Sequence, residues 1–115
     1  MDFGLSEEQK ILERTLLRFV EDSVPTSRVR RIMDTDSGYD ASVWAELADL
    51  GVAGVLVPEE HGGAGLTLLD ASVAACALGW GACPVPFLGT AVMAPVALRT
   101  AASPAQQQEW LPRIA

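Results

Sequence analysis

The chain has 115 residues, a formal net charge of −7 and an apolar content of 50%, enough for one domain built around one hydrophobic core. The acidic balance disfavours nucleic acid and anionic membranes as partners, because both bind basic surfaces. The apolar content fits either an alanine-rich helical domain or a domain with one face covered by another body.

Cys76 and Cys83 are the only cysteines. No targeting segment is recognisable at the start, and no apolar run reaches the ~18 residues of a membrane span. We therefore expect a cytoplasmic protein with free thiols. Neither cysteine has a histidine close in the sequence, so a nucleophilic role is not expected.

The first helix is predicted to begin after Ser6. Ser6 and Gln9 have the spacing of a capping box, in which each side chain bonds to the other residue's amide. Pro25 should break this helix, and Arg28–Met33 is a weaker pattern for a second, short helix. The first helix is expected to bury Leu12, Leu16, Phe19 and Val20, with Ile11 at the edge; the second, Val29, Ile32 and Met33.

A loop of turn-forming residues, Asp34–Gly38, precedes the third helix, which Asp40 or Ser42 should cap. Gly51 stands where a left-handed C-terminal cap is expected. The apolar segment Val52–Val57 has no second strand with which to pair, and we expect it to be a buried extended connection. The third helix should bury Val43, Trp44, Leu47 and Leu50.

The stretch Val57-Pro-Glu-Glu-His-Gly-Gly-Ala-Gly-Leu66 joins two helical patterns. Its three glycines indicate positive φ or close approach to another part of the chain. No phosphate-binding motif is present. His61, the only histidine, has no metal ligand at suitable spacing, and we interpret it as a solvated loop residue.

Three further helices are predicted. Thr67 and Asp70 form a second capping box, opening a helix that runs to about Gly79. Another helix should start at Pro86 and kink at Pro95. Ser103 and Gln106 cap the last one. The first of these helices is expected to have an apolar face of Leu69, Val73, Ala77 and Leu78. The face of the second should comprise Phe87, Leu88, Ala91, Val92, Val96 and Leu98, and that of the last Trp110, Leu111 and Ile114. The result is an all-α fold, an orthogonal or up-down bundle of about five or six helices.

Four segments in this order resemble the acyl-CoA dehydrogenase family. They are Phe3-Gly-Leu-Ser-Glu-Glu-Gln9, Trp44-Ala-Glu-Leu-Ala-Asp-Leu-Gly51, the glycine-rich bend described above, and Gln106-Gln-Gln-Glu-Trp-Leu-Pro-Arg113. The resemblance covers essentially the whole chain. It implies that residues 1–115 form the family's N-terminal helical domain, without its middle β-rich domain and C-terminal helical domain.

This resemblance also implies a function. Family members oxidise the α,β carbon–carbon bond of acyl-CoA thioesters in lipid metabolism, with FAD between the middle and C-terminal domains and the catalytic carboxylate in the C-terminal part. We therefore expect no catalytic residue, no cofactor-binding residue and no metal site here, and neither flavin binding nor activity from these residues alone. Glu59 and Glu60 are not assigned as bases.

In the family, the helix before the last lines the acyl tail. The resemblance places this role on Phe87, Leu88 and Ala91, with Cys83 and Pro84 at the approach. Each of these residues fits an ordinary core position equally well.

Three functions remain open. In the first, the chain is the N-terminal domain of a flavin-dependent acyl-CoA dehydrogenase, with acyl-CoA and the two missing domains as its partners. Alternatively, it is a non-flavin-binding structural subunit of a mixed acyl-CoA dehydrogenase oligomer, or a stand-alone helical interaction module. A homo- or hetero-oligomer is expected in the first two cases.

Overall fold

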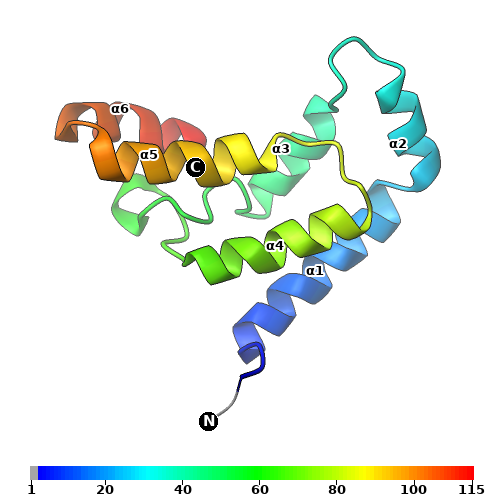
Figure 1. Ribbon diagram of the computed structural model, residues 1–115, viewed down its shortest axis with the longest axis horizontal. Coiled ribbons are helices and arrows are strands. Elements are labelled where there is room, and N and C mark those ends of the chain that lie inside the picture. The colour runs from blue at the N-terminus through cyan, green and yellow to red at the C-terminus, as the bar shows by residue number, and fades with distance from the viewer. Residues whose placement is uncertain (1–2) are drawn as a thin grey trace.

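The computed structural model describes residues 3–115, which form helices and no strand (Figure 1). The all-α prediction is confirmed. The elements are α1 (Glu7–Ser23), α2 (Thr26–Met33), α3 (Ala41–Asp49), the 3₁₀ turn η1 (Glu59–His61), α4 (Leu68–Trp80), the π-helical segment η2 (Leu88–Met93), α5 (Ala94–Ala101) and α6 (Pro104–Ile114).

The predicted caps are all present. Ser6, Thr67 and Ser103 each close a capping box, and Asp40 caps α3 by accepting from the amides of Ser42 and Val43. Hydrogen bonds of this kind satisfy amides that have no partner within the helix. The local sequence therefore sets where these helices begin.

The caps of α1 and α4 are joined to each other. Gln9 Nε2 donates to Asp70 Oδ1 at 3.0 Å, while the other Asp70 oxygen accepts from the Thr67 amide and hydroxyl. One carboxylate thus serves two helix N-termini, where the helix dipole favours negative charge. This link aligns the starts of α1 and α4, which pack side by side (Figure 1).

The helices form a slab with principal extents of 44 × 43 × 19 Å. Helices α4 and α5 lie at the front of Figure 1 in saturated colour, whereas α1, α3 and α6 lie behind. The core between these layers is built mainly from Leu16, Val20, Val43, Leu47, Leu56, Ala74, Leu78, Phe87 and Ala91.

The segment Val52–Val57 is buried, as predicted, but it is a series of turns and not extended. Its amides bond locally: Val55 donates to the Val52 carbonyl, and Val57 to the Gly54 carbonyl. The glycine-rich bend folds over these turns, with Ala64 donating to the Gly54 carbonyl and Leu66 to the Val55 carbonyl. A neighbouring loop therefore satisfies this buried backbone, and no strand partner is needed.

The three glycines of the bend are needed for two different reasons. Gly62 and Gly65 have φ values of +84° and +62°, in the left-handed region that favours glycine. Gly63 has an ordinary φ, but a Cβ placed on it would overlap the Val57 carbonyl oxygen. Both interpretations of the glycines, positive φ and close approach, are thus confirmed.

Several side chains predicted to be buried are exposed. Met33 is 72% exposed and Leu50 is 49% exposed; Met33 ends α2 and Leu50 directly follows the last residue of α3. The other differences of this kind are Leu69, Leu88, Val96 and Trp110.

The predicted kink at Pro95 takes an unexpected form. The π-helical segment η2 ends just before Pro95, and the Ala94 amide bonds to the Gly89 carbonyl five residues back. In a regular α-helix Pro95 would lack the bond to the Ala91 carbonyl and its ring would clash with that carbonyl. The wider π turns accommodate the proline, and such segments recur at functional sites.

An ion pair ties α2 to α3. Arg28 Nη2 donates to Asp40 Oδ2 at 2.9 Å and Arg28 Nη1 to the Ser23 carbonyl at 2.8 Å. The Ser42 hydroxyl donates to Asp40 Oδ1 at 2.6 Å. The Ser42 hydroxyl and then the Arg28 guanidinium hold the pKa of the Asp40 carboxyl well below its usual range.

We predict that Gly63→Ala destabilises the chain by about 1–3 kcal/mol, the usual range for inserting a methyl group into a packed site. The measurement is the denaturant midpoint of unfolding. The matched control is Gly79→Ala, where the added Cβ meets no atom within 4 Å, so its midpoint should stay or rise slightly. A Gly63→Ala midpoint equal to that of the control would contradict the close contact with Val57.

We also predict that Asp40→Asn destabilises the chain at neutral pH but not in strong acid. Because the folded pKa of Asp40 lies below the unfolded value of about 3.9, the carboxylate contributes fully above that pH. Its contribution disappears as pH falls through the lower folded pKa. Comparing unfolding free energies of both proteins between pH 7 and pH 2 tests this. A difference in unfolding free energy between the two proteins that does not change with pH would contradict this prediction. Asp36→Asn, which removes the same charge from an exposed loop, is the control.

Candidate functional site

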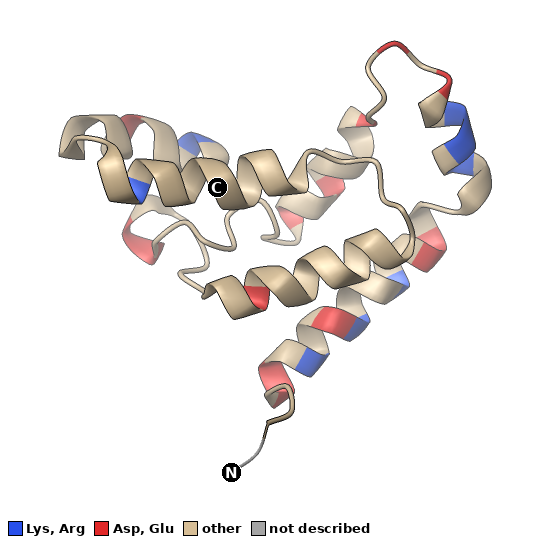
Figure 2. Cartoon of the chain, in the orientation of Figure 1, with Lys and Arg blue, Asp and Glu red and all other residues tan. Residues whose placement is uncertain are grey.

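The layer formed by α4, η2 and α5 carries almost no charge. Asp70 and Arg99 are the only charged residues between positions 68 and 101 (Figure 2). Both are held by protein groups: Asp70 by Thr67 and Gln9, and Arg99 by a hydrogen bond from Nη1 to the Leu56 carbonyl. This layer therefore presents a face without a free charge.

Large apolar side chains project from the same layer. Leu68 and Leu88 are each 61% exposed and Met93 is 68% exposed. Leu69 and Val96 are also exposed. Apolar side chains gathered in this way mark a surface that another body covers.

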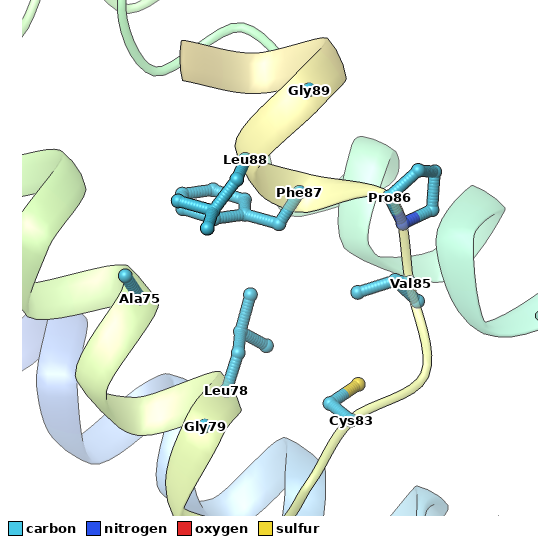
Figure 3. A pocket seen from close by; sticks show the side chains of 9 residues that line it. All are labelled: Ala75, Leu78, Gly79, Cys83, Val85, Pro86, Phe87, Leu88 and Gly89. Carbon is cyan, nitrogen blue, oxygen red and sulfur yellow. The ribbon is translucent and has the colours of Figure 1, made fainter. Parts of the chain in front are cut away.

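A groove runs between α4 and the start of η2 (Figure 3). Its larger part, a cavity of about 330 Å³, is lined by Ala75, Leu78, Gly79, Cys83, Val85, Pro86, Phe87, Leu88 and Gly89. Its smaller part, about 240 Å³, is lined by Leu68, Ala71, Ser72, Ala75, Leu88 and Val92. Ala75 and Leu88 belong to both, so the two parts form one continuous apolar groove.

In Figure 3, Leu78 points from α4 into the space below Phe87 and Leu88, and Cys83 lies at the opposite end. Small residues on α4 keep the groove open. Ala71, Ala75 and Gly79 recur every fourth residue and so share one helical face.

The structure brings three of the five predicted pocket residues together: Cys83, Phe87 and Leu88 line the larger part of the groove. Pro84 is half-buried and lies outside this lining. Ala91 is fully buried in the core beneath η2. Phe87 and Ala91 share the inward face, whereas Leu88 is rotated onto the groove rim.

The α4 side of the groove, Ala75, Leu78 and Gly79, was missed by sequence reasoning. The four-residue spacing of small side chains on α4 was the available signal. It is ambiguous in a sequence, because a small-residue face fits a tight helix–helix contact as well as a cavity wall.

Cys83 is a half-buried, unpaired thiol. Burial raises its pKa to about 11, and the positive charge of Arg28 opposes this only in part. At neutral pH Cys83 is therefore a protonated, unreactive wall residue.

No acid–base pair faces the groove among the residues that the structure describes. Glu59, Glu60 and His61 lie together in η1. His61 Nε2 is 3.7 Å from Glu60 Oε1, and its side chain is only 17% exposed, so it is less solvated than predicted. Residues 3–115 contain no group of His, Cys, Asp or Glu able to hold a metal, and no helix long and apolar enough to cross a membrane.

Comparison with known proteins agrees with the fold. Residues 6–115 match the family model "Acyl-CoA dehydrogenase, N-terminal domain". Acyl-CoA dehydrogenase IpdE2 of Mycolicibacterium smegmatis is 40% identical over 95 residues, 82% of this chain and 30% of its own length. Acyl-CoA dehydrogenase FadE27 of Mycobacterium tuberculosis is 33% identical over 111 residues, 96% of this chain and 30% of its own.

Two solved structures share the fold. One is the ChsE4–ChsE5 complex from Mycobacterium tuberculosis, with a TM-score of 0.90 and 29% identity over 99% of this chain. The other is the Tcur3481–Tcur3483 steroid ACAD G363A variant, with a TM-score of 0.85 and 33% identity over 94%. This chain covers 31% and 29% of those chains, so it spans about a third of the length of its relatives. The chain belongs to the acyl-CoA dehydrogenase family and corresponds to its N-terminal domain.

Proposed function

We propose that this domain forms one wall of the acyl pocket in a flavin-dependent acyl-CoA dehydrogenase, and that the complete enzyme oxidises the α,β carbon–carbon bond of an acyl-CoA. The observation that carries the proposal is the charge-free groove between α4 and η2. Apolar walls suit a hydrophobic acyl group. Polar recognition of the thioester and proton abstraction then fall to other parts of the enzyme.

Within this pocket Leu88 contacts the acyl group, and Cys83 and Phe87 form part of the wall behind it. Pro84 shapes the approach from α4, and Ala91 supports η2 from the core. The small residues Ala75 and Gly79 set the width.

Residues 1–115 are, in this proposal, the first of three domains, and the middle and C-terminal domains cover the exposed face. The accessible surface of 7152 Å² exceeds the roughly 6,100 Å² expected of a compact 12.2 kDa monomer. The apolar side chains left uncovered on α4, η2 and α5 contribute to this excess.

The described residues do not fit FAD, the cofactor that the family implies. A flavin pyrophosphate is typically bound by free amides at a helix N-terminus. Here the N-termini of α1, α3, α4 and α6 are already capped by their own side chains, and Asp70 adds negative charge at α4. The N-terminus of α2 has no side-chain cap, but this helix is only 8 residues long. We therefore assign flavin binding to another domain or subunit.

For the acyl group we propose a bulky, ring-containing skeleton. One of the two structural neighbours, the Tcur3481–Tcur3483 variant, is described as a steroid ACAD. The groove here is open along its length, because Ala75, Gly79 and Gly89 leave it wide, and this shape accepts a rigid ring system better than a narrow tunnel does.

A second function is favoured by one observation. Each of the two structural neighbours is named for two different chains, ChsE4 with ChsE5 and Tcur3481 with Tcur3483. This chain is then one subunit of a mixed oligomer in which the partner holds the flavin. In either case the unpaired cysteines support a reducing, cytoplasmic location.

We predict that the complete polypeptide carries about one FAD per chain and reduces an electron acceptor with acyl-CoA, whereas residues 1–115 alone do neither. Flavin absorbance and a dye-reduction assay measure both properties. If the complete polypeptide is free of flavin and becomes active only when a second subunit is added, the mixed oligomer is the correct alternative. Flavin retained at near one equivalent by residues 1–115 would contradict the proposal.

We predict that Leu88→Ala raises KM for a ring-containing acyl-CoA by about tenfold and affects a short acyl-CoA little, because each lost apolar contact in a pocket is worth ~1–3 kcal/mol. Leu69→Ala is the matched control, since Leu69 is exposed on α4 but outside the groove. Equal changes for both substrates would place the pocket elsewhere. Ala91 is unsuitable as a probe because it is buried.

A further inference from the structure

A second surface of interest lies on the edge between α1 and α4, around Trp80. This side chain is 65% exposed and lines two adjoining hollows of about 380 and 420 Å³. Glu21 also lines both, and Glu13 and Cys76 line the first. We call Glu13, Leu17, Glu21, Cys76 and Trp80 the tryptophan surface.

The tryptophan surface is suited to a cation next to an apolar side chain. Neither Glu13 nor Glu21 forms an ion pair within the described residues, and no lysine or arginine lines either hollow. An indole face flanked by carboxylates attracts a guanidinium by cation–π and ionic contact. Exposed tryptophan is also the side chain most enriched at binding hot spots.

The same chain carries a complementary surface on α2. Arg30, Arg31 and Met33 are exposed there, and we call them the basic face. Most other cations are engaged: Lys10, Arg28 and Arg113 in ion pairs, and Arg14 and Arg99 on carbonyl oxygens. Among the described residues, Arg30 and Arg31 are the one adjacent pair of cations without a hydrogen bond or ion pair.

The two surfaces adjoin, which allows a symmetric contact. Pro25 and Thr26, where α2 begins, line the second hollow beside Trp80. Helix α2 then runs away from the ends of α1 and α4 (Figure 1), so α2 does not cover the tryptophan surface beside it. In a dimer with its two-fold axis near Thr26, each basic face would meet the tryptophan surface of the other copy. In such an isologous contact the same pair of surfaces meets twice, once on each side of the two-fold axis, so the assembly is complete as a dimer.

We propose that the tryptophan surface is an interface that binds the basic face of a second copy of this chain. The contact is separate from the acyl groove, which opens on the other side of α4, and it does not depend on the proposed enzymatic function. The charges that meet are opposite in sign, and Met33 lies against the Trp80 indole. Association through this contact weakens as salt is added.

The test uses the complete polypeptide and measures alkylation of Cys76 by iodoacetamide, with mass spectrometry to locate the label. Cys76 is exposed in one copy and covered in the proposed contact. We expect R30E/R31E to speed labelling of Cys76 by about tenfold at concentrations where the protein associates. Added negative charge by itself disfavours a thiolate and would slow labelling, so the sign separates loss of contact from electrostatics.

Charge exchange identifies the occupant. E13K/E21K/R30E/R31E should restore slow labelling, because the opposite charges meet again with their signs reversed. The matched control, E46K/D49K/R30E/R31E, has the same net charge but moves the lysines to exposed positions on α3, and should stay unprotected. Thermal midpoints of all variants confirm folding. Unchanged or slower labelling in R30E/R31E overturns the proposal. Fast labelling in the charge-exchanged variant also overturns it and indicates a different polypeptide as occupant.

Discussion

Gly63 and the Val57 carbonyl are in such close contact that no side chain fits between them, and the position of the glycine-rich bend depends on this contact. It lets the glycine-rich bend lie on the buried turns of residues 52–57 and satisfy their carbonyls. Arg99 of α5 reaches the Leu56 carbonyl on the same segment, and Ala115 at the end of α6 lies against Gly54. Helices from both halves of the chain are thereby positioned against one buried, irregular segment.

The distribution of charge follows from that arrangement. Helix starts on α1, α3, α4 and α6 use side-chain caps, and the few charges close to the core, such as Arg28 and Asp40, are paired. Apart from the cap of α4 and the bond of Arg99, the front layer carries no charge, and α4 and η2 meet through small and apolar residues. What remains there is an uncharged groove with Leu88 on its rim, next to a π-helical segment imposed by Pro95. The acyl group is thus proposed to bind where the helix geometry is least regular.

Much of the site was predictable from the residues and the family resemblance, and the rest was not, for a specific reason. Cys83, Phe87 and Leu88 do line one groove. Ala91 does not, because it is fully buried in the core beneath η2, where residues distant in the sequence cover it. The opposite wall comes from α4, and no local pattern shows that Ala75 and Gly79 face η2 across a gap.

The sequence by itself determined the class of fold, the capped starts of α1, α3, α4 and α6 and the need for glycine in the bend. These depend on hydrogen bonds and backbone angles among residues close in the chain. Only the tertiary structure decided which apolar faces are covered, that residues 52–57 form turns, and that Leu88 is exposed while Ala91 is buried. The physical reason is that short-range patterns fix the direction in which a side chain points but not which part of the chain packs against it. Burial depends on the distant helix that lies opposite.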